Sequence, residues 1–252
     1  MNVFFTLIKR ELLEHNSLWR VPIILLVLAI LIRLSSVFGN YAADINIPDQ
    51  LQPNDTIDAW VDSALASSLG WVNSIIVPTM FVVAVFYALN CLFTERQDQS
   101  VLFWRSLPVS DALTVASKLT VAVVIVLLLI IVCHIISAFI FLGAGSFEFL
   151  INVFGETLLS IFKLVLWSLL PTAAWCMFCS EFCKRNPFLL AIFIPLGLVL
   201  VDNLFFDGSV DNMLVINRVF GFSDYSIWPL LSGVLLSGVF LYMATIKRKQ
   251  RI

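Results

Sequence analysis

Four ionisable side chains lie inside long apolar stretches of this chain, and their types and depths make them its first candidates for chemistry. They are Arg33, His134, Lys163 and Asp202. If these stretches cross a bilayer, each such charge is costly and marks a candidate functional site. Arg33, Lys163 and Asp202 fall near the ends of their stretches, where snorkelling brings them to water. The alternative is an outer vestibule in which one of the two cations pairs with Asp202 or Glu156.

His134 lies deeper, just past the middle of its stretch. A proton relay would need carboxylates at a similar depth, and the sequence offers none there. We therefore expect His134 to hydrogen-bond a neighbouring helix. No paired carboxylates or Ser/His pair at one depth accompany it, so the sequence predicts no catalytic residues.

Three of the five cysteines are spaced i, i+3, i+7, which places Cys176, Cys179 and Cys183 on one helix face. Thiolates so arranged could bind a metal, but a structural zinc site takes four ligands and both histidines lie elsewhere. We expect these thiols to pack as small apolar groups, with no metal site. We also expect no structural disulfide, because no cysteine falls in a segment exposed to an oxidising compartment.

The composition excludes most soluble classes. The chain has 252 residues, of which 60% are hydrophobic and 13% charged, and its mean hydropathy is +0.99. A soluble domain carries about 25% charged residues. With 15 basic and 17 acidic residues the net charge is −2, which lacks the basic excess of a nucleic-acid binder. An integral membrane protein remains.

Six stretches have the roughly 20 apolar residues that a membrane-crossing helix needs. They are residues 18–37, 71–93, 119–143, 158–178, 188–206 and 227–246. A β-barrel strand would alternate over about 10 residues, whereas residues 121–132 form an unbroken apolar run. The sequence therefore predicts an all-α integral membrane protein with one transmembrane domain, residues 1–252.

The basic residues set the orientation, because cytoplasmic segments carry an excess of Lys and Arg. With the N-terminus inside, cytoplasmic segments hold 12 of the 15 basic residues, and none lies between Arg33 and Arg96. The intervening outer loop, residues 38–70, is acidic and is expected to be a solvated loop. We predict a multi-pass protein of the bacterial plasma or inner membrane with both termini cytoplasmic.

Residues 1–17 precede the first stretch and have apolar residues at helical spacing with charges between them. The apolar residues are Phe4, Phe5, Ile8, Leu12 and Leu13. This pattern predicts an amphipathic helix that lies in the membrane interface. A plain helical lead-in to the first span is the alternative, and both place the segment at the inner surface.

The cytoplasmic loop after the second stretch has the most distinctive sequence. Residues 95–111 read E-R-Q-D-Q-S-V-L-F-W-R-S-L-P-V-S-D, and the run ends near Lys118. Ser110 or Asp111 is a plausible N-cap for a following helix. This run resembles the corresponding loop of ABC-2 type permeases, the membrane subunits of one class of ATP-binding cassette transporter. The N-terminal segment L-I-K-R-E-L also resembles that family's interfacial elbow helix.

The resemblance implies that two permease subunits, identical or related, pair in the bilayer above two ATPase subunits. It also implies that the loop forms a coupling helix seated in a groove of the ATPase, so that ATP binding and hydrolysis drive export. Phe103, Trp104 and Leu107 would be buried anchors, and Pro108 would fix the bend. The implied coupling residues are Glu95, Arg96, Asp98, Phe103, Trp104, Arg105, Ser106, Leu107, Pro108, Ser110 and Asp111.

One expectation is independent of the resemblance. The ten glycines contain no loop of the form G-x-x-x-x-G-K-[ST], and no Gly-Lys pair occurs. That loop cradles the phosphates of ATP, so we expect no cofactor on this chain, and if ATP drives this protein another chain must bind it. The resemblance implies that ATP with Mg is bound by a partner ATPase. The chain itself is then not an enzyme.

Two other classes of function stay open on the sequence alone. A secondary transporter usually shows inverted repeats and ion-binding residues inside the membrane, and no half-to-half similarity is evident here. A membrane scaffold without transport is the other alternative. The substrate and the choice between homodimer and heterodimer do not follow from the sequence.

Overall fold

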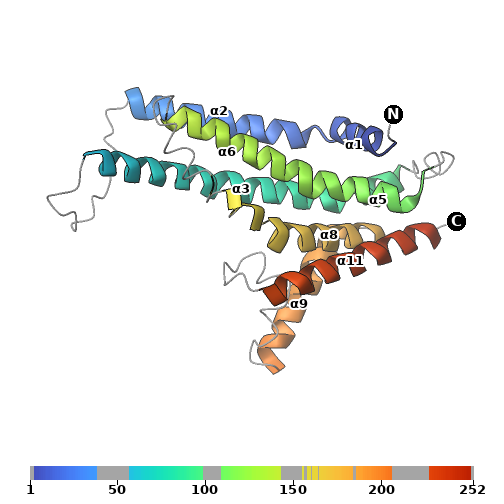
Figure 1. The fold of residues 1–252 in the computed structure, drawn as a ribbon. Helices are drawn as coiled ribbons and strands as arrows, with labels where there is room; N and C mark the ends of the chain where they lie inside the picture. The colour runs from blue at the N-terminus through green and yellow to red at the C-terminus, as the bar shows by residue number, and fades with distance from the viewer. Residues whose placement is uncertain are drawn as a thin grey trace. The chain divides into compact units, whose positions relative to one another are not determined.

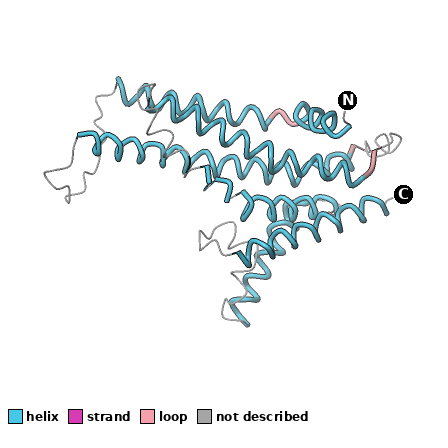
Figure 2. Tube along the Cα trace, in the orientation of Figure 1, coloured by secondary structure: helices cyan, strands magenta, loops and turns pink. Residues whose placement is uncertain are grey.

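The computed structural model describes residues 3–38, 57–98, 109–142, 155, 158–159, 161–163, 165–183, 186–205 and 227–250. Within these ranges the chain is helical almost throughout and contains no strand (Figure 2). The all-α fold class is therefore confirmed for the described part of the chain.

Eight α-helices and two π-helical turns make up the described elements discussed below. The α-helices, labelled in Figure 1, are α1 (Val3–Glu14), α2 (Ser17–Phe38), α3 (Ile57–Gln97), α5 (Asp111–Thr120), α6 (Val126–Leu142), α8 (Leu170–Phe182), α9 (Pro187–Phe205) and α11 (Ile227–Gln250). The π-turn η1 (Val121–Ile125) joins α5 to α6, and η2 (Val165–Leu169) leads into α8.

Five described segments are long and apolar enough to cross a membrane, and each overlaps a predicted stretch. They are Ser17–Leu34, Ser74–Gln97, Asp111–Ile140, Ile161–Phe182 and Leu230–Gln250. The remaining predicted stretch, residues 188–206, coincides with α9, whose apolar part, Pro187–Asp202, is shorter. Large apolar side chains on α2 and α9, such as Ile24 and Phe193, are more than half exposed. These features are typical of a multi-pass membrane protein, whose lipid-facing surface is apolar.

One sequence expectation was wrong. Residues 38–70 were expected to be a solvated loop, but α3 begins at Ile57 and runs for 41 residues to Gln97. The physical reason is local composition: between Pro53 and Gly70 the chain has no Pro or Gly, the two residues that most disfavour helix. A low hydropathy argues against a membrane crossing there, but it does not argue against a helix.

Several helices also continue past their apolar stretch at the polar end. α5 begins at Asp111, eight residues before the apolar stretch that starts at residue 119, while α8 continues to Phe182 and α11 continues to Gln250. The extensions of α5 and α11 carry Asp111, Lys118 and Arg248 of the candidate site described below.

Contacts divide the chain into two compact units. The first unit comprises Met1–Asn16, Phe81–Leu127 and Ile161–Ile252, and the second comprises Ser17–Met80 and Leu128–Ser160. In the first unit α11 packs along α8, while α5 contacts both α1 and α11. The second unit contains α2, the first part of α3 and most of α6. Ser137 of α6 is buried and donates a hydrogen bond to the carbonyl of His134, 2.9 Å away.

The packing of α11 on α8 in the first unit uses small residues and aromatic rings. Gly233 and Ser237 are buried, and the Ser237 hydroxyl donates to the Gly233 carbonyl at 2.6 Å. Phe240 of α11 contacts Trp175 and Phe178 of α8, with ring centroids 5.1 and 5.5 Å apart. Small side chains allow the two backbones to approach, and the rings fill the space beside them.

Candidate functional site

Lys118 of α5 lies at the centre of a buried group of charges in the first unit. Its side chain is 1% exposed, and its ammonium nitrogen is 2.7 Å from Glu11 Oε1 and 3.2 Å from Glu95 Oε1. It also donates to the carbonyl oxygen of Cys91 at 3.0 Å. The contacts with Glu11 and Cys91 are hydrogen bonds, and the contact with Glu95 is an ion pair. Tyr87 donates to the other oxygen of Glu11 at 3.0 Å.

Arg248, near the end of α11, joins the same group from the opposite end of the chain. Its Nη1 donates to Glu95 Oε2 at 3.0 Å, and its Nε donates to Asp111 Oδ1 at 3.1 Å. The Arg248 side chain is 4% exposed. Glu95 therefore bridges two cations, Lys118 on one oxygen and Arg248 on the other. We call Glu11, Glu95, Asp111, Lys118 and Arg248 the charge cluster.

Two residues of α1 form the rim of the charge cluster. Arg10 Nη2 donates to Glu95 Oε1 at 3.0 Å, and its Nε donates to Glu14 Oε1 at 2.7 Å. Burial works against the Arg10 charge, but the carboxylates of Glu14 and Glu95 outweigh it and raise the pKa of Arg10. The cation is therefore held firmly at this edge.

His15 follows α1 and stacks edge-on against Tyr87, with ring centroids 4.8 Å apart. Burial lowers the pKa of His15, and the Lys118 ammonium acts in the same direction, while Glu11 and the other nearby carboxylates oppose it. His15 Nε2 lies 3.8 Å from Glu11 Oε2. A neutral imidazole thus covers the cluster at neutral pH.

The buried charges balance. Glu11 and Glu95 carry two negative charges and Lys118 and Arg248 two positive ones, all on residues less than 7% exposed. Isolated ions could not remain charged there, but paired and hydrogen-bonded ions can. Removing one partner of a buried pair typically costs about 3–5 kcal/mol. The charge cluster therefore fixes how α1, α3, α5 and α11 meet.

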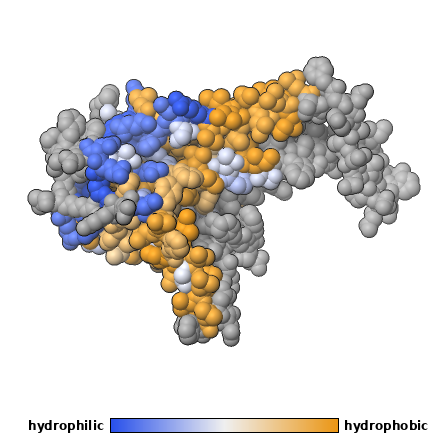
Figure 3. All heavy atoms as spheres, turned by 180° about the vertical axis from the view of Figure 1, so that it is seen from behind, coloured by the Kyte–Doolittle hydropathy of each residue, from blue (hydrophilic) through white to orange (hydrophobic). Residues whose placement is uncertain are grey.

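Local sequence explains why these side chains converge. In α1 the buried residues Leu7 and Glu11 are four apart and share one face, while Phe5 and Leu13 are 66% and 68% exposed. The face of this amphipathic helix that carries Leu7 and Glu11 thus meets the protein. Figure 3 shows hydrophilic surface at the end of the first unit and hydrophobic surface along its helices.

Two residues implied by the resemblance, Glu95 and Asp111, lie in the charge cluster and are joined through Arg248. Arg96 has a different place: its guanidinium donates to the carbonyls of Glu181 and Cys183 at the end of α8, the first at 2.9 Å. Cations favour helix C-termini, where carbonyls lack intrahelical partners. Arg96 thereby ties the end of α3 to the end of α8.

Ser110 is the N-cap of α5, which confirms the predicted helix start. Its backbone is extended, with φ −73° and ψ 144°, and its side chain accepts from the Leu113 backbone N–H at 3.3 Å. Asp98 is exposed at the end of α3. The remaining implied residues, Phe103, Trp104, Arg105, Ser106, Leu107 and Pro108, lie outside the described residues.

The four ionisable residues inside the apolar stretches divide between the units. Arg33 and His134 belong to the second unit, and Lys163 and Asp202 to the first. Arg33 and Lys163 are exposed, whereas His134 and Asp202 are 2% and 3% exposed. Glu156, the other carboxylate considered for an outer vestibule, lies outside the described residues.

The cysteines on one face of α8 are packed in the first unit. Cys176 and Cys179 are 3% and 0% exposed, and Cys183 is half-buried at the end of the helix. Burial raises the free energy of a charged thiolate, so these groups suit packing. The described residues contain no group of three or more His, Cys, Asp or Glu side chains placed to hold a metal ion.

Sequence reasoning missed the roles of Glu11, Lys118 and Arg248. Each is a charge at the polar end of a helix, a position that usually indicates a solvated residue. The available signal was in α1, where Glu11 falls on the same helical face as Leu7 rather than opposite it. Spacing along one helix does not identify partners 107 and 153 residues away in the chain.

Comparisons with known proteins identify no relative of this chain. No protein-family model matches it, and neither a curated protein nor a solved structure matches it significantly.

Proposed function

We propose that this chain is the permease subunit of an ATP-binding cassette exporter, in which a separate ATPase subunit binds and hydrolyses ATP. The observation that supports this proposal best is a distance. Glu95 and Lys118, the two ends of the stretch that resembles a coupling loop, are 3.2 Å apart and buried. A loop that transmits force needs both of its ends fixed to the body it moves.

The charge cluster would hold the helices at the two ends of the loop rigidly together. A displacement of the loop would act on Glu95 and Asp111, which Arg248 and Lys118 connect to α11 and α5, and through Glu11 to α1. Separating buried opposite charges is costly, so these helices would move together. Arg96 extends the same connection to the end of α8.

The proposal also sets the membrane arrangement. The five apolar segments and α9 would be six spans, with both termini in the cytoplasm. α1 would lie in the interface, with Phe5 and Leu13 toward the lipid and Glu11 toward the protein. A second permease subunit, identical or related, would complete the translocation path, and two ATPase subunits would dock beneath the loops.

Co-purification from a gentle detergent tests the proposal. The tagged chain should retain an ATPase subunit, and Trp104→Ala or Phe103→Ala should lose it, because aromatic anchors often dominate an interface. Trp19→Ala is the matched control, since Trp19 is an exposed aromatic on α2 and lies outside the proposed contact. It should retain the ATPase.

The opposite outcome would redirect the search. If the wild type remains monodisperse but no ATPase accompanies it, the exporter proposal fails. The alternatives are then a secondary transporter, tested by ion-driven uptake into vesicles, and a scaffold, which would show no transport.

A further inference from the structure

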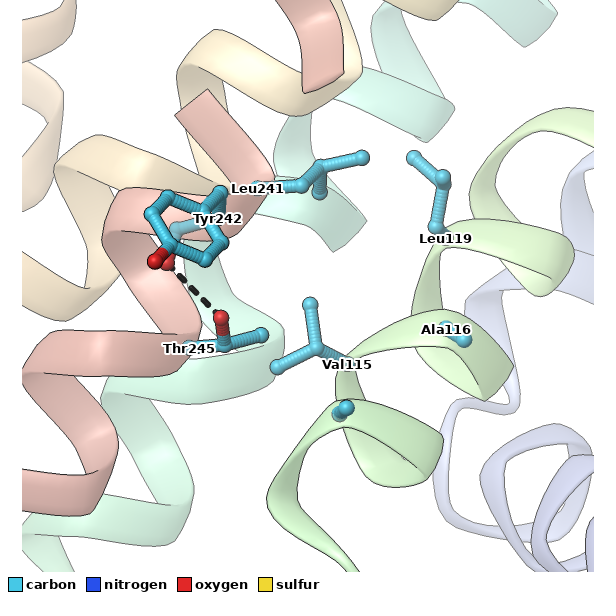
Figure 4. A pocket seen from close by; sticks show the side chains of 7 residues that line it. Val115, Ala116, Leu119, Leu241, Tyr242 and Thr245 are labelled. Carbon is cyan, nitrogen blue, oxygen red and sulfur yellow. Dashed lines mark hydrogen bonds between the residues drawn. The ribbon is translucent and has the colours of Figure 1, made fainter. Parts of the chain in front are cut away.

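An open groove lies between α5 and α11 in the first unit, beside the charge cluster. Its volume is about 170 Å³, and it is lined by Ala112, Val115, Ala116, Leu119, Leu241, Tyr242 and Thr245. Figure 4 shows Leu119 and Leu241 across the space from each other, with Val115 facing Thr245 further along. The groove is therefore apolar along its length.

The side chains around the groove show where it opens. Val115 is 2% exposed and forms part of the floor, whereas Ala112 and Ala116 are exposed and Tyr242 is 67% exposed. Both helices belong to segments apolar enough to cross a membrane, Asp111–Ile140 and Leu230–Gln250. An opening on the side of such segments meets lipid rather than bulk water.

The size of the groove restricts its occupant. Sites for drug-sized ligands enclose about 300–1,000 Å³, so this groove is too small for one. A dry apolar cavity of about 150 Å³ can hold a molecule such as benzene. A segment of extended hydrocarbon chain suits both the volume and the elongated lining.

The polar end of the groove is basic. Tyr242, Thr245 and Lys249 are spaced i, i+3, i+7 and share one face of α11. Arg248 is engaged by Glu95 and Asp111, and the Lys247 ammonium lies 5.7 Å from the centre of the Phe182 ring. Lys249 is exposed, and among the described residues no ion pair is found for it. It can therefore bind an anion at the mouth of the groove.

We propose that this groove binds one anionic phospholipid, with an acyl chain between α5 and α11 and the headgroup phosphate at Lys249. A cluster of basic residues at the end of a membrane helix attracts anionic lipid, by about 1 kcal/mol for each Lys or Arg. Besides the buried Arg248, the chain here has three basic residues, Lys247, Lys249 and Arg251. The proposal does not depend on the ATPase partner.

The first test maps the site on the full-length chain. The protein is reconstituted in phosphatidylcholine vesicles that contain phosphatidylglycerol with a diazirine in its acyl chain, and labelled peptides are identified after irradiation. We expect labelling concentrated on residues 112–119 and 241–245. Labelling no greater there than on exposed residues of α2 and α9, which report bulk lipid, would overturn the proposal.

The second test distinguishes binding of the lipid's acyl chain from binding of its headgroup. It uses native mass spectrometry with added phosphatidylglycerol or phosphatidylcholine. Ala116→Phe fills the groove and should lower retention of both lipids about tenfold, whereas Val124→Phe, at an exposed position of η1, should not. Lys249→Gln should remove about a fivefold preference for phosphatidylglycerol, equivalent to about 1 kcal/mol. Lys9→Gln, also at an exposed lysine, should keep that preference.

Each variant tests one part of the lipid-binding proposal. Unchanged retention in Ala116→Phe overturns the acyl-chain site, and an unchanged lipid preference in Lys249→Gln overturns the headgroup contact. Competition by soluble glycerophosphoglycerol would indicate a phosphate site without a chain and would also overturn the proposal. If Ala116→Phe does not fold, the crosslinking pattern of the wild type decides the question.

Discussion

Lys118 and Glu11 are separated by 107 residues in the sequence and meet in an ion pair of 2.7 Å. Their side chains are 1% and 2% exposed, so water neither screens this pair nor replaces it. The pair joins the first helix of the chain to the helix that follows the proposed coupling loop. Its contribution can be measured without knowing the substrate.

Replacement of Lys118 by Met should be strongly destabilising. The variant leaves Glu11 and Glu95 buried without their shared cation, and we expect a loss of about 3–5 kcal/mol in the free energy of unfolding. Unfolding of the purified chain in mixed detergent with increasing SDS measures it. Lys249→Met removes a solvated lysine and should change stability by less than about 0.5 kcal/mol. Equal effects of the two variants would contradict a special role for Lys118.

Replacement of Arg248 by Lys should lower the thermal stability of the protein. Its guanidinium contacts Glu95 through Nη1 and Asp111 through Nε, and an ammonium cannot reproduce this fork. Thermal unfolding should rank wild type above Arg248→Lys and Arg248→Lys above Arg248→Met. A lysine variant as stable as wild type would mean that charge alone, not fork geometry, holds α11 at the cluster.

Acidification should destabilise the protein through His15. Burial lowers its pKa below the ordinary value of 6.5, so the unfolded chain binds this proton more readily than the folded one. Stability contributed by the neutral imidazole is therefore present above about pH 6.5 and falls as the pH decreases through that value.

Comparison of wild type with His15→Gln isolates this effect. The variant should show a shallower loss of thermal stability than wild type on acidification from pH 7. Superimposable pH profiles would show that His15 does not contribute.

The N-cap of α5 should contribute modestly to the free energy of unfolding. Ser110→Ala removes the acceptor for the Leu113 N–H, and such changes cost about 1 kcal/mol. Ser110→Asp keeps an acceptor and adds a favourable charge at the helix N-terminus, so its stability should stay near that of wild type. Chemical unfolding of both variants side by side makes the comparison; an alanine variant as stable as the aspartate variant would argue against the cap.

The sequence predicts the helices better than it predicts their ends. Hydropathy locates five of the long apolar segments because the membrane imposes the same requirement on each residue of a span. It does not report where a helix stops, which is why the start of α3 at Ile57 and the continuation of α11 to Gln250 were not foreseen. Those ends depend on local helix propensity and on tertiary partners.

The candidate site likewise combines local features, which the sequence predicts, with long-range contacts, which it does not. Ser110 is predictable as an N-cap because capping is a local interaction between neighbours in sequence. Glu95 and Asp111 were named through a family resemblance, but Lys118 and Glu11 were not, because their burial depends on contacts between distant helices. Single-sequence patterns carry no information about which charges are paired across such a distance.

The position of Arg248 on α11, which follows α1, α3 and α5 in the sequence, has a consequence for biosynthesis. A chain is made and inserted from its N-terminus, so Glu11, Glu95 and Lys118 are all in place before α11 exists. Until then Lys118 and, at the rim, Arg10 are the cations that contact Glu11 and Glu95, and Asp111 lacks Arg248. α11 therefore completes the charge balance of the cluster, and a nascent chain in which α11 has not yet been made leaves Glu95 and Asp111 without Arg248.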